Sequence, residues 1–146
     1  MGDREGGFSL TEALVVAALL AILVMVAVPQ LAVPESLSAG TQARQLAADL
    51  RLAQRLAIAR RANYVLDFTP AAPPYLTYSV HLQGGGPEPD YPKDIASGVT
   101  VSGPQQFVFQ PDGTTATGGT VTLVAGGATA TVQVIVPTGR VTVVEP

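Results

Sequence analysis

The sequence predicts an α+β protein in which a long N-terminal helix packs on a head of mostly antiparallel β-strands. Three observations predict this fold. Residues 13–28 carry no polar side chain, residues 39–57 repeat small and apolar side chains at three- and four-residue steps, and period-two alternation begins near Asn63. Glycine and proline turns then join the short strands, which favours antiparallel pairing.

The composition limits the classes of function. The chain has 146 residues, enough for one compact domain beyond the apolar segment. Its formal net charge of -3 argues against wholesale electrostatic binding of nucleic acid, although it leaves room for a local basic patch. The absence of cysteine excludes disulfides, thiolate metal sites and cysteine catalysis.

The apolar segment is long enough to cross a membrane. Residues 8–28 span roughly the 30 Å of a bilayer core at about 1.5 Å per residue. A cleaved secretory signal would place small residues after the apolar core, whereas Gly6 and Gly7 precede it. A plain anchor would not explain Glu12, because an acid near the start of a membrane helix is costly and calls for a cationic partner. We expect another molecule to supply that cation.

Residues 7–12 read Gly-Phe-Ser-Leu-Thr-Glu, and an apolar run that ends at Pro29 follows them. This pattern resembles the class III signal of type IV prepilins and type II secretion pseudopilins. The resemblance implies that prepilin peptidase, a membrane-embedded aspartyl peptidase, cuts after Gly7 and methylates the new amine of Phe8. It also implies that Glu12 meets the Phe8 amine of a neighbouring subunit during assembly.

The second helical segment follows Pro29 and Pro34, which interrupt the helical pattern and predict a kink or a short non-helical stretch. Ser36 or Ser38 is the expected N-cap, and the helix should run to about Arg61. One face carries small and apolar residues: Ala39, Ala43, Leu46, Leu50, Ala53 and Ala57.

Three arginines, Arg44, Arg51 and Arg55, share the opposite face of this helix. They admit three interpretations: a solvated helix back, contacts between subunits of a filament, or contacts with DNA phosphates.

The remainder of the chain predicts strands. Residues 75–82 alternate as a half-buried strand should, with Leu76, Tyr78, Val80 and Leu82 on one face and Tyr75, Thr77, Ser79 and His81 on the other. A loop that we expect to be mobile then runs to about Ile95. The other expected strands cover residues 64–68, 99–101, 106–110, 120–124, 129–136 and 140–144.

Several patterns of the head resemble pseudopilins and minor pilins of the GspH/FimT type. They include Phe-x-Phe-x-Pro-x-Gly over residues 107–113 and Gly-Arg-Val at residues 139–141. FimT-like minor pilins are associated with DNA capture in natural transformation through a Gly-Arg-x-Arg motif. Here Gly139 and Arg140 match that motif, but Thr142 occupies the position of its second arginine.

Catalysis and metal binding have little support in the sequence. The single histidine, His81, lies in an alternating strand with no acid in a recognisable motif beside it. Glu88, Asp90 and Asp94 lack the spacing of a calcium loop and are expected to be solvated. Neither a helix nor a Lys-Ser/Thr pair follows the three glycines at 84–86, so they do not form a phosphate-binding loop. We therefore expect no enzyme activity, cofactor or metal.

The expected organisation is a leader peptide at 1–7, a transmembrane and assembly helix at 8–28, an amphipathic half-helix at 29–62 and a β-rich head at 63–146. Two functions stay open. The first is a structural subunit of a type IV pilus or type II secretion pseudopilus, which starts in the inner membrane with its head outside the cytoplasm and ends in a periplasmic or cell-surface filament. The second is a FimT-like minor pilin that binds DNA. Prepilin peptidase, other pilins and the inner membrane are the expected partners, with DNA as the alternative.

Overall fold

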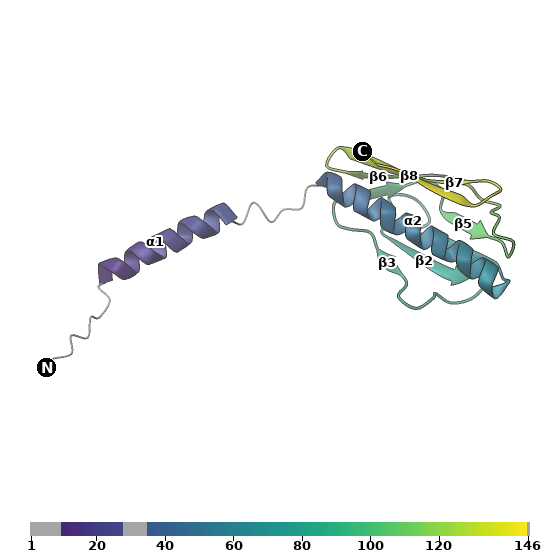
Figure 1. Ribbon diagram of the computed structural model, residues 1–146, viewed down its shortest axis with the longest axis horizontal. Coiled ribbons are helices and arrows are strands. Elements are labelled where there is room, and N and C mark those ends of the chain that lie inside the picture. The colour runs from purple at the N-terminus through teal and green to yellow at the C-terminus, as the bar shows by residue number, and fades with distance from the viewer. Residues whose placement is uncertain (1–9, 28–34, 146) are drawn as a thin grey trace. The chain divides into compact units, whose positions relative to one another are not determined.

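The computed structural model of the chain describes the backbone of residues 10–27 and 35–145, with side chains for residues 10–21 and 39–145 (Figure 1). The chain divides into two compact units, residues 1–33 and residues 34–146. Each unit is a separate body and has its own structure.

The first unit contains α1, Leu10–Ala27. Its leucines and alanines are strong helix formers, and every side chain from residue 10 to residue 21 is exposed. The predicted membrane-crossing segment, residues 8–28, extends at both ends beyond the described residues. In the described parts of the chain, no helix combines the length and the hydropathy needed to cross a bilayer.

The second unit begins with α2, Glu35–Arg60. The predicted buried face is confirmed, because its six predicted residues and Ala47 are at most 1% exposed. The predicted N-caps are wrong, because both Ser36 and Ser38 lie inside the helix, which begins one residue before Ser36. The predicted interruption at Pro29 and Pro34 lies outside the described residues.

Within residues 35–145, eight strands form two four-stranded sheets, and every pairing between these strands is antiparallel. Sheet A has the order β3-β2-β1-β5 and sheet B the order β4-β6-β7-β8. The strands are β1 Tyr64–Thr69, β2 Thr77–Leu82, β3 Lys93–Asp94, β4 Thr100–Ser102, β5 Gln106–Phe109, β6 Gly119–Ala125, β7 Ala128–Ile135 and β8 Arg140–Val144. The predicted strands are thus confirmed to within two residues, and β3 was not predicted.

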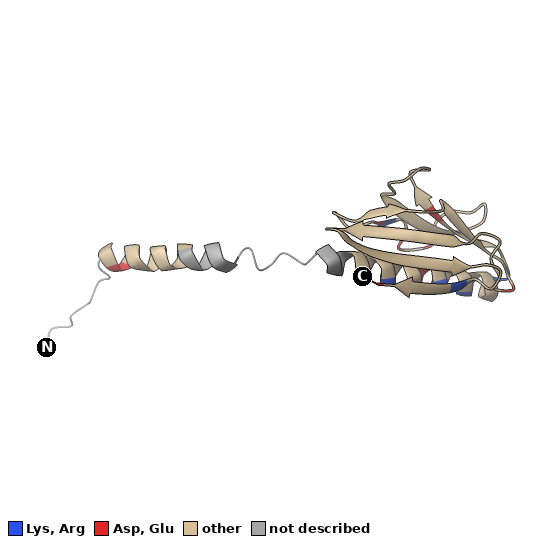
Figure 2. Ribbon diagram, turned by 90° about the horizontal axis from the view of Figure 1, so that it is seen from above, with Lys and Arg blue, Asp and Glu red and all other residues tan. Residues whose placement is uncertain are grey.

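The core lies where α2 crosses both sheets (Figures 1 and 2). Leu46 and Leu50 of the helix are buried with aromatic rings of sheet A and valines of sheet B, among them Tyr64, Phe68, Tyr78, Phe107, Phe109, Val121 and Val132. All of these residues belong to the second unit. The hydrophobic core of the head is therefore complete without α1.

The alternation predicted over residues 75–82 is wrong at both ends, because Leu82 is 40% exposed and the first two residues are reversed. Tyr75 is 2% exposed and Leu76 is 65% exposed, so the aromatic ring faces inward and the leucine outward. The reason is a link between the sheets: Tyr75 donates its N–H to Val101 O (3.1 Å) and its hydroxyl to Gly103 O (2.7 Å). This segment thus pairs with β4 before it enters sheet A.

Two turns of the head dock on α2 at Gln54. The Gln54 amide donates to Gly113 O (2.6 Å) and to Thr138 O (3.2 Å). Gly139 has φ of 66°, and a Cβ on it would lie 2.6 Å from Gln54 Nε2. Glycine is therefore required at 139 for both its backbone angle and its close approach to the helix.

Candidate functional site

The N-terminal signal is described only in part. Gly7 and Phe8, the predicted cleavage and methylation residues, lie outside the described residues. Glu12 lies in the first turn of α1 and is exposed. A carboxylate there interacts favourably with the partial positive charge at a helix N-terminus.

The three arginines of α2 form what we call the arginine flank: Arg44, Arg51 and Arg55. Arg44 Nε and Nη2 both donate to the Glu145 carboxylate just after β8. This hydrogen bonding raises the pKa of Arg44 and lowers the pKa of Glu145. Arg51 Nη2 donates to Val141 O of β8 (3.0 Å). The flank therefore lies beside the open edge of sheet B, where side chains that bond edge carbonyls discourage strand addition.

The structure thus corrects one interpretation of the arginines. All three are exposed, as predicted, with 68% of the Arg44 side chain accessible. They are not simply a solvated helix back, because Arg44 and Arg51 hold β8. Within the described part of the chain, only Arg55 of the three makes no hydrogen bond or ion pair.

Arg140, the fourth candidate arginine, is separated from the flank. It is the first residue of β8 and is exposed, whereas the next residue, Val141, is buried against the core. Because successive side chains of a strand point to opposite faces, Arg140 lies on the outer face of sheet B. The structure therefore brings together three of the four predicted contact residues and leaves Arg140 on a different surface.

The other side of α2 carries a part-buried ion pair that the sequence did not reveal. Lys93 Nζ lies 2.9 Å from both carboxylate oxygens of Asp49, and the Tyr78 hydroxyl donates to the same carboxylate (2.7 Å). The Asp49 side chain is only 8% exposed. Burial, with a smaller contribution from this hydrogen bond, raises the pKa of Tyr78. The Tyr91 ring also packs against the Lys93 ammonium, 4.8 Å from ring centroid to Nζ.

A second ion pair anchors the segment expected to be a mobile, solvated loop. Arg60 binds Glu88 (2.6 Å), and the Tyr64 hydroxyl donates to Glu88 as well (2.8 Å). The Glu88 side chain is 15% exposed, so the expectation that it is solvated is wrong. The attraction to Glu88 raises the pKa of Arg60. Together with the Lys93 pair, this contact ties residues 84–95 to α2.

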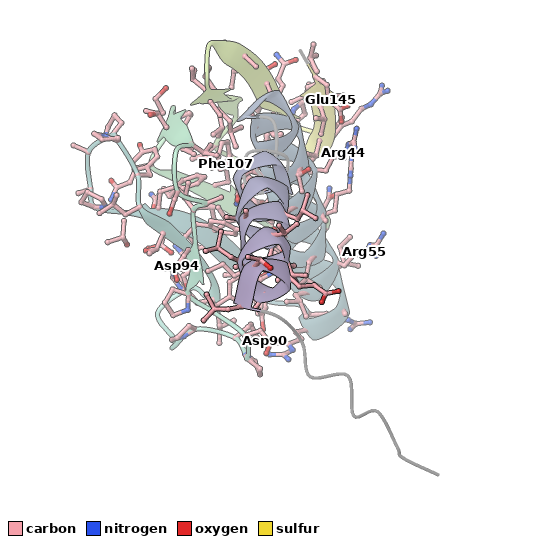
Figure 3. The ribbon with its side chains drawn as sticks, turned by 90° about the vertical axis from the view of Figure 1, so that its left-hand side faces the viewer. Arg44, Arg55, Asp90, Asp94, Phe107 and Glu145 are labelled. Atoms are coloured by element: carbon pink, nitrogen blue, oxygen red, sulfur yellow. The ribbon has the colours of Figure 1, made fainter. Side chains whose placement is uncertain are left out.

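We call residues 84–95 the acidic strap, because three of its residues, Glu88, Asp90 and Asp94, are acidic. Asp90 and Asp94 are exposed, as predicted, and neither side chain has a bonding partner among the described residues. Figure 3 shows Asp94 on the left of the head, and Arg44 and Arg55 on the right. Asp94 and these two arginines therefore lie on opposite sides of α2.

The structure adds little support for a catalytic histidine or a metal site. His81 has an acidic neighbour after all: its Nε2 lies 3.3 Å from Asp67 Oδ1, across the β1–β2 pair. Strand pairing brings these residues together, which no local motif could indicate. Over the described residues, no three His, Asp or Glu side chains form a cluster that could hold a metal ion.

Comparison with known families decides the classification. The family model described as type II transport protein GspH matches residues 42–139. The chain belongs to the GspH family. A second model, the prokaryotic N-terminal methylation motif, matches residues 2–28 and implies prepilin processing. The chain is therefore of the minor pilin and pseudopilin type found in type IV pili or type II secretion systems.

Solved structures share the fold of this GspH-family chain. The type IV minor pilin FimU of Pseudomonas aeruginosa is 20% identical with a TM-score of 0.59, covering 73% of this chain and 91% of FimU. The minor pseudopilin EpsH from the Type 2 Secretion System of Vibrio cholerae is 13% identical with a TM-score of 0.59, covering 75% of this chain and 98% of EpsH. No curated protein sequence gives a significant match. The predicted pilin-like α+β fold is confirmed.

Proposed function

We propose that this chain is a structural subunit, a minor pilin or minor pseudopilin, which assembles into a filament through its N-terminal helix. The observation that carries the proposal is the joint match of one chain to the methylation motif over residues 2–28 and to GspH over residues 42–139. The division into two units supports it. The head has a complete core of its own, so α1 is available for contacts outside the chain.

Processing is the first step of this function. Prepilin peptidase cuts between Gly7 and Phe8 and methylates the Phe8 amine, which leaves α1 at the very start of the mature chain. Before assembly, this apolar segment holds the chain in the inner membrane with the head outside the cytoplasm. No role as an enzyme is part of the proposal.

Assembly depends on Glu12. A carboxylate within an apolar helix bundle is costly, by at least about 2.5 kcal/mol on insertion scales, until a cation compensates it. The Phe8 ammonium of a neighbouring subunit is such a cation, and it reaches Glu12 only when the two helices are offset along the filament. A buried pair of this kind sets the register between subunits.

The experiment is to replace Glu12 by valine and to measure filament incorporation in sheared surface or periplasmic fractions. Glu12→Val should be processed and inserted as well as the parent, because valine lowers the cost of the membrane state. Incorporation should fall sharply. Leu10→Val is the matched control, because it changes α1 two residues earlier without touching a charge. Incorporation of Glu12→Val at the parent level would overturn the role of the carboxylate.

DNA binding is a second candidate, favoured by one observation: Arg55 and Arg140 both remain exposed and have no side-chain bonds within the described residues. The engagement of Arg44 and Arg51 by β8 and the presence of Thr142 in place of a second motif arginine weigh against it. A gel shift with residues 35–146 and duplex DNA tests it, since phosphate contacts weaken steeply as salt rises.

A further inference from the structure

The outer face of sheet B carries almost no charge. Between Ile95 and Val144, the only charged residues of the sequence are Asp112, which lies in a turn, and Arg140. Twelve side chains of β4, β6, β7 and β8 point outward, away from the core of the described head, and Arg140 is the one charged side chain among them. Most of the strand ribbon is accordingly tan in Figure 2, whereas blue recurs along α2.

The same face is stiff. Six of its outward side chains are threonine and three are valine or isoleucine, so most of them are branched at Cβ. Branching at Cβ restricts χ1, and cross-strand pairs such as Thr122 with Thr131 set the spacing of these side chains. Such side chains lose little conformational freedom on binding, which removes part of the cost of association.

Both edges of sheet B are engaged within the head. Tyr75 donates its N–H to Val101 O on the edge strand β4 (3.1 Å), and Arg51 Nη2 donates to Val141 O on the edge strand β8 (3.0 Å). Backbone groups bonded in this way are not available to an added strand. A partner of sheet B therefore meets the side chains of its outer face.

We propose that the outer face of sheet B docks on the head of a different subunit of the same filament, through a flat and uncharged surface of that subunit. The inference rests on the proposed function as a filament subunit. The partner surface is uncharged because a charged group buried against this face would lose its water with almost no compensating charge from this chain.

The size of the face indicates a neighbour in the filament rather than a free protein. At about 3.4 Å per residue and about 4.8 Å between strands, the four strands cover roughly 400 Å². A stable interface between free proteins buries about 800 Å² on each partner. A neighbour that its own N-terminal helix holds in the filament meets this face at a high effective concentration, so a smaller contact suffices.

Symmetry indicates that this neighbour is not a second copy of the chain. Two copies that met through this one face would form a closed two-fold pair, which cannot continue along a filament. A second copy would therefore have to present another of its surfaces. The arginine flank, the acidic strap and the outer face of sheet A, with Asp67 and His81, all carry charged or ionisable groups. None of them matches an uncharged face.

Photo-cross-linking of the full-length chain, in cells that assemble the filament, tests this contact. The substitution Thr131→p-benzoylphenylalanine places the probe on β7, between β6 and β8. Ser79→p-benzoylphenylalanine, on β2 in the middle of sheet A, is the matched control. Thr131 should cross-link to one other protein, identified by mass spectrometry, that has its own N-terminal methylation motif. Ser79 should not give that product.

Charges of either sign at Thr122 then check the chemistry of the contact. Thr122→Asp and Thr122→Lys should each lower the yield of the Thr131 product about fivefold or more, because an uncharged partner surface stabilises neither ion. Thr122→Val and the same two charges placed at Ser79 should leave the yield unchanged. The urea midpoint of residues 35–146 checks the fold of each variant, and Thr129→Asp and Thr129→Lys, on the same face, replace any Thr122 variant that unfolds.

The outcomes separate this inference from the proposed function. The inference is overturned by a product between two copies of this chain, by a product with a protein that lacks the methylation motif, or by an equal yield of the same product from Ser79. It is also overturned if both charges leave the yield unchanged, or if Lys raises it while Asp lowers it, as an acidic partner such as DNA requires. If the chain enters filaments and Thr131 gives no product, the inference fails and the proposed function stands; if the chain never enters filaments, both fail.

Discussion

The two helices of this chain differ in where their apolar side chains lie and in what covers them. In α2 the apolar residues are confined to one face, and the two sheets of the same chain cover that face completely. In α1 the apolar residues surround the helix, and Leu10, Leu14 and Leu20 are all more than half exposed. An amphipathic helix needs a partner on one side only, whereas a helix that is apolar all round needs an apolar environment on every side. The apolar face of α2 is therefore covered within its own unit, whereas among the described residues of the first unit nothing covers α1.

The largest effect on stability should come from the covered face of α2. Leu50 is fully buried between the sheets, and Leu50→Ala should cost about 2 to 5 kcal/mol, because it loses apolar burial and leaves a cavity. Urea denaturation of the head, residues 35–146, measures it. Leu52→Ala, on the exposed side of the same helix, is the control. An equal loss at both positions would show that the helix face has been misassigned.

The next largest loss of stability should come from breaking the part-buried ion pair of Lys93 and Asp49. Lys93→Met keeps the length of the side chain but leaves the Asp49 carboxylate, among the described residues, with the Tyr78 hydroxyl as its one hydrogen-bond donor, at a cost of about 1 to 3 kcal/mol. The free energy of unfolding at neutral pH is the measurement. Asp94→Asn, the adjacent exposed position, should change it by less than about 0.5 kcal/mol. A loss no greater than that control would mean that the strap does not depend on the pair.

The smallest loss of stability should come from substitutions on the arginine flank. Arg51→Ala loses one hydrogen bond to Val141 O at an exposed edge and should cost about 0.5 to 1.5 kcal/mol. Arg55→Ala should be neutral within about 0.5 kcal/mol, since Arg55 has no such bond in the described part of the chain. Equal midpoints for the two variants would indicate that Arg51 does not hold β8.

Much of the head could be predicted because its signals are local. The period-two patterns and glycine turns predicted most of the strands, and the spacing from Ala39 to Ala57 predicted the buried face of α2. At Tyr75 and Leu76 the same rule failed, because a pairing with Val101 in the other sheet decided which side chain turned inward. A contact between sheets leaves no periodic trace in either segment.

The functional residues divide in the same way. A contiguous motif predicted Gly7, Phe8 and Glu12 as the processing and assembly residues, and for these it remains a prediction. The pair of Asp49 and Lys93 could not be predicted, because the two residues are 44 positions apart and β3 is only two residues long. The one signal in the sequence was Asp49, an acid beside Leu50 on the margin of the apolar face. Such an acid predicts a cationic partner but does not identify the residue that supplies the cation.

The central claim is that the mature chain begins at Phe8 and exposes α1 for assembly, and an intact mass of the membrane-extracted protein tests it most directly. We predict a mass equal to residues 8–146 plus one methyl group, with the methyl on the N-terminal amine in fragment spectra. Gly7→Val should give only the full-length chain, because a side chain before the scissile bond obstructs the peptidase. An unprocessed wild-type chain, or a cut after the apolar segment near Pro29, would contradict the account.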